Sequence, residues 1–180
     1  ARRAVARAVL IAPMTGIYLH GLPGLMARAL VRAARSVGTS TRYAPFQAPY
    51  NERARRRAAS VLTSDPDRFE DEIVACRANP DLALGGVTYG WLGAAFRSIY
   101  RLRAPGFAEA IATPILMVLA GEEQVVDNRA ARRFHARLPD ARLVEIDGAR
   151  HEILKERDAL RQQFWAAFDA FMDAPANPSP

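Results

Sequence analysis

Residues 115–152 determine how this chain can fold. They contain four segments in succession: ILMVLA at 115–120, GEEQVVDN at 121–128, LVEID at 143–147 and GARHE at 148–152. An uninterrupted apolar run that stops at a glycine indicates a strand covered on both faces. We therefore expect strands at 115–120 and 142–146, joined by a helix at about 128–137. If the two strands are parallel neighbours, their exit loops meet at one edge of the sheet, where open α/β folds bind their ligands.

A further strand is expected near the start of the sequence, at Ala8–Ala12, where an apolar run stops at Pro13. The sequence has no initiator methionine and enters this strand almost at once, so we expect residues to be missing on its N-terminal side. The predicted fold class is α/β. The predicted organisation is a core strand at 1–14, a helical cap or lid at 15–105, an α/β core at 106–173 and a disordered tail at 174–180.

The region between the first two strands carries helical signals and no strand pattern. We expect helices at about 25–36, 64–78 and 89–101. Ser64 and Asp67 have the spacing of a capping box, and Pro66 suits the first helical turn. A last helix is expected at about 157–172, with an apolar stripe that packs on the sheet. That stripe contains Leu160, Phe164, Phe168 and Phe171.

The composition is that of a globular domain, because half of the 180 residues are hydrophobic. The apolar runs are far shorter than the roughly 20 residues that cross a bilayer, and no charged-then-apolar leader opens the sequence. We expect a cytoplasmic protein, with transient contact with the surface of the inner membrane as a further prospect. The single cysteine, Cys76, has no partner for an internal disulfide, and we expect it to be a small buried residue.

Arginine dominates the basic residues, and the net charge is +6. An arginine excess raises the question of nucleic acid or anionic lipid as a partner. The arginines are interleaved with acids in most segments, and no nucleic-acid recognition motif is present, so we expect no nucleic-acid partner. The dense run RARRR at 53–57 is interpreted as a solvated helix face, with a phosphate or headgroup contact as the alternative.

The candidate chemistry lies in the two exit loops. Glu123 and Asp127 follow the strand at 115–120, and His151 follows the next strand. A histidine alone in a loop is usually a surface residue, but an acid followed by a histidine is the chain order of α/β-hydrolase triads after their serine. Such a histidine takes a proton from the nucleophile, and the acid holds its other ring nitrogen. Asp127 has a structural alternative, because it precedes Asn128 at a helix start and suits an N-cap.

Metal and nucleotide sites are not indicated. His151 and Glu152 begin a zinc-protease pattern, but Lys155 stands where the second histidine ligand belongs. His20 and His135 have no partners at metal-ligand spacing, and neither a P-loop nor a GxGxxG pattern occurs. We expect no cofactor.

Five phrases of the sequence together resemble bacterial lysophospholipases of the monoacylglycerol-lipase-like branch of α/β-hydrolases, a group of the serine aminopeptidase S33 type. These phrases are AVLIAPM (8–14), LTSDPDRF (62–69), PDLALGGVTYGWLGAAFRSI (80–99), PILMVLAGEEQVVDNRAARRF (114–134) and IDGARHEILKERDALR (146–161). The resemblance extends from about Arg7 to Met172. It implies the C-terminal part of an α/β-hydrolase fold, with about three parallel strands, flanking helices and an inserted helical cap.

The resemblance also implies an activity and the residues that perform it. It implies a serine esterase that cleaves a lipid or another small ester, with cap aromatics along the path of the acyl chain. His151 matches the catalytic histidine of the family. Glu123 stands where the family commonly has aspartate, so the acid remains open between Glu123 and Asp127. The aromatics expected along the acyl path are Phe46, Tyr50, Trp91, Phe96 and Tyr100. For each of them, plain packing between the cap helices is the alternative.

The nucleophile of such an enzyme is a serine within a GxSxG elbow, and this sequence contains no GxSxG. Its serines occur in cap, turn or tail contexts. They are Ser36, Ser40, Ser60, Ser64, Ser98 and Ser179. Two hypotheses follow: a hydrolase whose serine lies outside these residues, or a truncated or degenerate segment that is inactive or acts only as a binding module. Oligomeric state is not indicated by the sequence.

Overall fold

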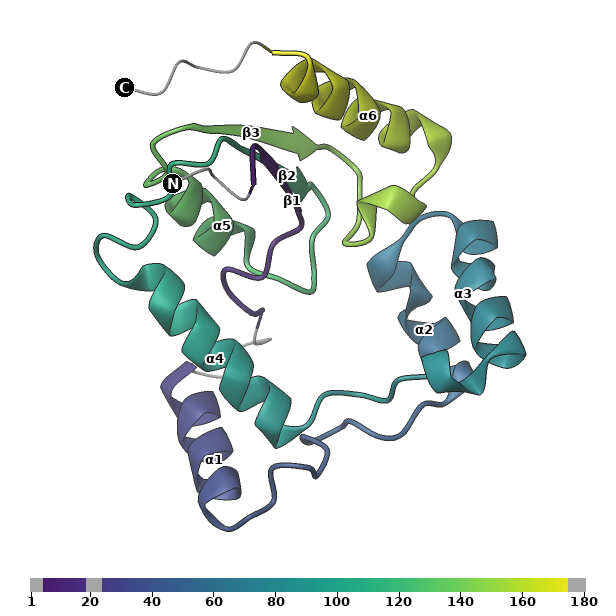
Figure 1. The fold of residues 1–180 in the computed structure, drawn as a ribbon. Coiled ribbons are helices and arrows are strands. Elements are labelled where there is room, and N and C mark those ends of the chain that lie inside the picture. The colour runs from purple at the N-terminus through teal and green to yellow at the C-terminus, as the bar shows by residue number, and fades with distance from the viewer. Residues whose placement is uncertain (1–4, 19–23, 175–180) are drawn as a thin grey trace.

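A computed structural model describes residues 5–18 and 24–174 of the chain. Within them, three parallel strands form one sheet in the order β1-β2-β3 (Figure 1). The strands are β1 (Ala8–Ile11), β2 (Ile115–Ala120) and β3 (Ala141–Ile146). The register pairs Ile11 with Val118 and Val118 with Val144, so all three strands end at the same edge. The predicted α/β class with about three parallel strands is confirmed.

The central strand β2 is apolar throughout because helices cover both of its faces. Leu116 and Val118 point to α6 (Asp158–Met172), where Phe164 and Phe171 are buried against them. The alternate residues of β2 instead pack with α5 (Asn128–His135), through Ala131 and Phe134. The predicted stripe on the last helix is confirmed, since Leu160 and Phe168 also pack on this cluster.

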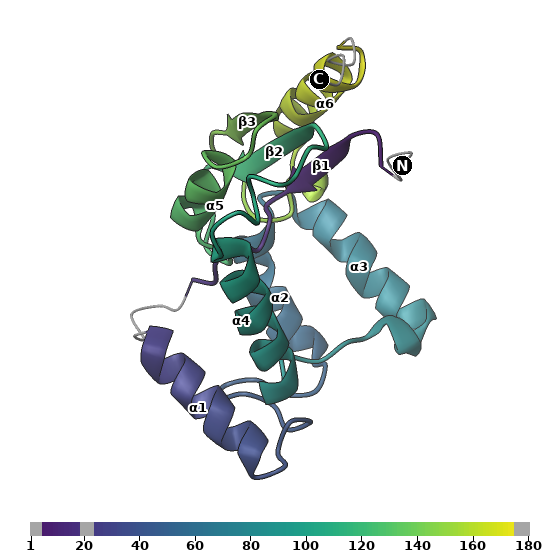
Figure 2. The same ribbon diagram turned by 60° about the vertical axis from the view of Figure 1, so that its left-hand side comes forward.

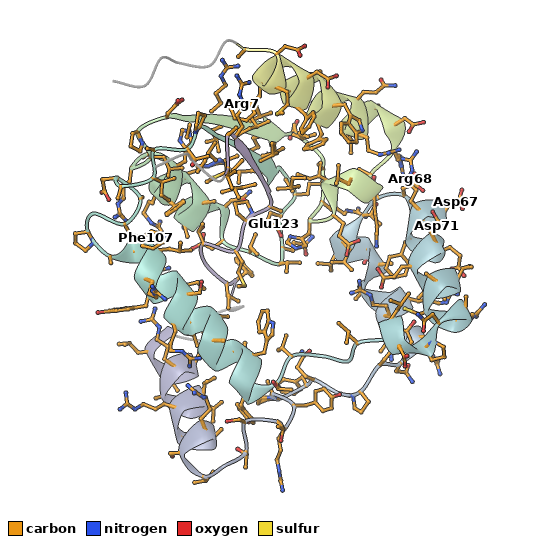
Figure 3. The ribbon with its side chains drawn as sticks, viewed as in Figure 1. Arg7, Asp67, Arg68, Asp71, Phe107 and Glu123 are labelled. Carbon is orange, nitrogen blue, oxygen red and sulfur yellow. The ribbon has the colours of Figure 1, made fainter. Side chains whose placement is uncertain are left out.

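Arg7, which directly precedes β1, ties that strand to the end of α6. Its guanidinium donates to the main-chain carbonyls of Phe171, Met172 and Ala174 and lies 5.6 Å from the centre of the Phe171 ring (Figure 3). A cation at a helix C-terminus satisfies carbonyls that have no partner within the helix. Residues 175–180, most of the predicted tail, lie outside the described residues.

Four α-helices of the described residues, which we call the inserted helices, lie between β1 and β2. They are α1 (Gly24–Ser36), α2 (Glu52–Leu62), α3 (Pro66–Ala78) and α4 (Tyr89–Arg103). They extend from the edge of the sheet where the strands end (Figures 1 and 2). Helix α1 packs with α4 and α2 packs with α3. Among the described residues, no helix is long and apolar enough to cross a membrane.

The start of α3 differs from the predicted capping box. Asp65, not Ser64, caps the helix: its Oδ1 accepts from the backbone N–H groups of Asp67 and Arg68, both at 3.1 Å. The prediction for Ser64 was wrong because its backbone N–H and its hydroxyl both donate to Glu156. The helix itself begins at Pro66 and ends at Ala78, close to the predicted bounds.

The arginine run of α2 is only partly a solvated face. Arg55 donates to both carboxylate oxygens of Glu72 on α3, at 2.5 and 2.9 Å. Arg56 pairs with Glu70 and, at 3.1 Å, with Glu52. The pairs with Glu72 and Glu70 hold α2 against α3, whereas the pair with Glu52 lies within α2. Cys76 on α3 is half-buried, so the expectation of a buried cysteine was wrong.

Glu72 makes the stability of the protein depend on acid pH. The hydrogen bond from Arg55, helped by Lys155 and opposed by burial, lowers the pKa of Glu72 from 4.5 to about 2. A carboxylate with a lowered folded-state pKa contributes stability above its unfolded pKa, and this is lost as pH falls towards the folded pKa. We expect Glu72→Gln to lower the free energy of unfolding by about 1 kcal/mol at neutral pH, allowing for solvent screening, and to change it very little near pH 2.

The measurement is urea unfolding, between neutral pH and about pH 2, of the natural gene product that contains these residues. Asp71→Asn is the matched control, because Asp71 is exposed on the same helix and forms no ion pair in the described part of the chain (Figure 3). Equal pH dependence in the Glu72→Gln variant and the unmodified protein would contradict this account.

Candidate active site

The exit loops of β2 and β3 lie against each other at the edge of the sheet. The backbone N–H of Gly121 donates to Ile146 O at 2.9 Å, and that of Glu122 donates to Ala149 O at 2.8 Å. A Cβ on Gly121 would lie 2.9 Å from the Cα of Asp147, so only glycine permits this approach. The two loops therefore carry their side chains to one place.

Glu123 and His151 meet there. The Nδ1 atom of His151 lies 2.9 Å from Glu123 Oε2 and 3.0 Å from Oε1. The Glu123 side chain is 1% exposed, whereas that of His151 is 24% exposed. Glu123 Oε1 also accepts from the backbone N–H groups of Val125 and Val126, at 2.7 and 3.1 Å. Figure 3 shows Glu123 at the end of the strands, on the side of the inserted helices.

The contacts of Glu123 determine its charge. Burial by itself raises the pKa of this carboxyl, but hydrogen bonds from His151 and from the backbone of Val125 and Val126 outweigh it, so the pKa is lowered. An ionised carboxylate only accepts hydrogen bonds, so Nδ1 of His151 must carry the proton between them. In the neutral ring, Nε2 is then a free base, and among the described residues it has no hydrogen-bond partner.

Asp127 has a different place. Its Oδ1 accepts from the backbone N–H groups of Arg129 and Ala130, at 2.9 and 3.2 Å, and so caps α5. Its Oδ2 lies 3.6 Å from the guanidinium of Arg133. The structure thus brings Glu123, and not Asp127, into contact with His151. Whether Glu123 is the catalytic acid remains a prediction.

Sequence reasoning missed one residue beside this site, Glu156. Its carboxylate is completely buried. One oxygen accepts from the backbone N–H of Arg150 at 2.8 Å, and the other accepts from the backbone N–H of Ser64 at 3.0 Å and from its hydroxyl. Glu156 therefore joins the residue before His151 to the junction of α2 and α3. Arg150 repeats this link by donating to Thr63 O at 2.9 Å.

Removal of the Glu156 carboxylate should destabilise the protein strongly. Glu156→Ala leaves the part-buried backbone N–H groups of Arg150 and Ser64 without their acceptor, at about 1–3 kcal/mol each. We expect a loss of about 3 kcal/mol in unfolding free energy, measured by urea titration. Glu122→Ala is the control, since the Glu122 side chain is 55% exposed and, among the described residues, forms an ion pair only with Arg150, at 3.5 Å. It should change stability by less than about 0.5 kcal/mol. Equal losses in the two variants would contradict the role given to Glu156.

The other described histidine, His135, does not join the site. His135 lies on α5, with Nε2 3.3 Å from Ala141 O. His20 lies outside the described residues. Residues 5–18 and 24–174 contain no group of three or more histidine, cysteine or acidic side chains arranged to hold a metal ion.

Comparison with known proteins identifies the family. The family of serine aminopeptidase, S33 matches residues 1–158 of this chain. The chain belongs to that family. Lysophospholipase L2 of Escherichia coli K12, a relative, is 32% identical over 187 aligned residues, which cover 94% of this chain and 51% of that protein. Probable lysophospholipase L2 of Haemophilus influenzae is 35% identical over 97 residues, covering 54% of this chain and 30% of that protein.

Solved structures show the same fold in this S33 family chain and in known lipases. Monoglyceride lipase of Saccharomyces cerevisiae, a soluble variant in complex with a substrate analogue, superposes with a TM-score of 0.68 at 12% identity, covering 94% of this chain and 53% of that one. Monoacylglycerol lipase of Paleococcus ferrophilus gives 0.67 at 18% identity, covering 93% and 58%. The α/β-hydrolase resemblance predicted from the sequence is confirmed. The chain spans about half the length of the relatives that it matches.

Proposed function

We propose that these residues form the acid and histidine part of the active site of a carboxylic ester hydrolase. The observation that carries the proposal is the contact between His151 Nδ1 and the buried carboxylate of Glu123 at 2.9 Å, at the edge of the sheet where such folds place their sites. Membership of the S33 family supports it. The proposed substrates are lysophospholipids or monoacylglycerols, because the relatives carry the names lysophospholipase and monoglyceride lipase.

In the proposed reaction, a serine hydroxyl from outside these 180 residues attacks the ester carbonyl carbon. His151 Nε2 accepts the hydroxyl proton while Glu123 stabilises the resulting imidazolium. The C–O bond to the alcohol then breaks, and the proton passes from His151 to the departing oxygen. Water, activated in the same way, cleaves the acyl-serine and releases the fatty acid. In this scheme Asp127 takes no part in the proton transfer, and its role is to cap the N-terminus of α5.

The inserted helices are the proposed cap over the acyl-binding region, corresponding to residues 15–105. The five cap aromatics do not line one path, however. Phe96 and Tyr100 line a groove between α1 and α4. Phe46 and Tyr50 line a separate hollow beside α2, and Phe46 is fully exposed. Of the five, Trp91 is the remaining candidate for contact with an acyl chain.

A non-catalytic binding module is the second candidate function, and the absence of GxSxG from the sequence favours it. The test is to express the natural gene product that contains these residues and to treat it with a fluorophosphonate probe, which labels activated serines. Hydrolysis of a short-chain nitrophenyl ester is measured in parallel. Labelling with hydrolysis supports the enzyme, and a soluble, folded protein that shows neither overturns it. A cytoplasmic location beside the inner membrane is part of the same proposal.

A further inference from the structure

Helices α1 and α4 enclose an open groove of about 640 Å³. Phe96 and Tyr100 of α4 form part of its wall, and the guanidinium of Arg28 lies 5.9 Å from the centre of the Phe96 ring. The groove is strongly basic. Its arginines are Arg28, Arg32 and Arg35 from α1 and Arg97 and Arg101 from α4.

The charges of this groove are not balanced by the protein. The sequence has no aspartate or glutamate at 1–51 or at 82–108, the two stretches that contain α1 and α4. Within the described part of the chain, none of the five arginines forms an ion pair, whereas Arg55 and Arg56 of α2 both do. Guanidinium groups gathered without acids create a positive field that attracts an external anion.

An exposed apolar surface adjoins the arginines. Leu25, Met26 and Leu30 of α1 are 80%, 61% and 47% exposed. At about 100° per residue, Leu25 lies directly beside the face that carries Arg28 and Arg32, and the other two continue around the helix. A helix with arginines beside exposed large apolar side chains is typical of segments that lie in a membrane interface. A free phosphate or a nucleic acid would give these apolar side chains no partner.

The groove is separate from the Glu123–His151 pair. Most groove residues of α4 lie on the side of that helix opposite Trp91 by helical spacing, Arg101 being the exception. Figure 2 shows α1 at the end of the molecule far from the sheet. A ligand in the groove therefore has no direct access to His151.

We propose that the α1–α4 groove docks the protein on bilayers that contain anionic phospholipids. The arginines bind lipid phosphates, and Leu25 and Met26 enter the boundary between headgroups and acyl chains. This inference does not rest on the proposed ester hydrolysis. It also replaces the RARRR run as the headgroup contact, because the central arginines of that run are paired with acids.

The first experiment is co-sedimentation of the natural gene product with vesicles of phosphatidylcholine alone and of phosphatidylcholine mixed with phosphatidylglycerol. We expect binding to the anionic vesicles only, weakening as salt rises. Each arginine near an anionic surface contributes about fivefold in affinity, so the triple variant Arg28→Gln/Arg32→Gln/Arg97→Gln should bind roughly a hundredfold more weakly. A matched control removes three exposed arginines elsewhere that have no ion pairs within the described residues: Arg53→Gln/Arg57→Gln/Arg129→Gln.

Equal weakening of vesicle binding in the two triple variants would show an effect of net charge alone and would overturn the proposed role of the groove.

The second experiment uses Leu25→Ser/Met26→Ser and, separately, glycerol phosphate as a soluble competitor. We expect the serine variant to lose at least about tenfold in vesicle binding, and the competitor to have little effect. Full binding by the serine variant together with release by glycerol phosphate would show a site for phosphate alone and overturn bilayer docking. Circular dichroism melting of each variant confirms that it is folded.

Discussion

Replacement of His151 by alanine is expected to lower ester hydrolysis by the natural gene product at least about ten-thousandfold in kcat. The reason is that Nε2 of His151 is the base in the proposed site, and its ring is held by Glu123 through Nδ1 at 2.9 Å. Loss of one member of a serine–histidine–acid unit removes most of the rate that the unit supplies. The measurement is kcat and KM with a short-chain nitrophenyl ester.

His135→Ala is the control for this substitution. His135 is half-buried on α5, and in the described structure its ring has a hydrogen-bond contact only with the carbonyl of Ala141. We therefore expect kcat within about threefold of the unmodified protein. Fluorophosphonate labelling should be lost with His151→Ala and retained with His135→Ala, because the probe reports an activated serine. Retention of full activity by the His151→Ala protein would refute the assignment of the base.

Exchange of Glu123 for glutamine is expected to lower kcat by about a thousandfold to ten-thousandfold. The amide keeps the size of the side chain but loses the charge that stabilises the imidazolium. One of its two carboxylate oxygens is also replaced by an NH2 group, which donates and cannot accept the proton of Nδ1. Because the pKa of Glu123 is lowered by its contacts with His151, Val125 and Val126, the carboxylate is ionised throughout the neutral range. The effect should therefore appear in kcat, with KM little changed.

Asp127→Asn is the matched test of the other acid. Asparagine caps a helix about as well as aspartate, so α5 should remain in place and kcat should change by less than about threefold. Urea unfolding of both variants shows that any loss of activity is not a loss of folding. A larger fall in kcat for Asp127→Asn than for Glu123→Gln would reverse the choice of acid.

The positions of the candidate site residues were predictable because strand direction determines the edge of the sheet at which they emerge. An apolar run followed by a polar loop places the loop at the carboxyl end of a buried strand, and parallel strands bring such ends together. Glu123 and His151 therefore lie at the same edge. What the sequence left open was which acid contacts the histidine, since Glu123 and Asp127 occur in the same loop. In the structure Glu123 makes this contact, because the Asp127 side chain accepts hydrogen bonds from the first turn of α5 instead.

Features that depend on pairing between distant segments were not predictable. Glu156 is one of nineteen acidic residues, and its sequence neighbours do not indicate that it is buried against Ser64, which lies 92 residues earlier. Because Ser64 donates to Glu156, the N-cap of α3 is Asp65 and not the predicted Ser64. Likewise, the arginine run of α2 was predicted to be a solvated face, but Arg55 and Arg56 form ion pairs with Glu72 and Glu70 of α3.

The sequence by itself determined the α/β class, the parallel strands, the apolar face of α6 and the edge at which His151 emerges. All of these follow from local periodicity and chain direction, which act between near neighbours. Only the tertiary structure decided that Glu123 contacts His151, that Glu156 holds the histidine loop to the inserted helices, and that the arginines of α1 and α4 form one unpaired groove. Those outcomes depend on which side chains distant in the sequence come into contact, because such contacts determine which groups are buried and which charges are paired.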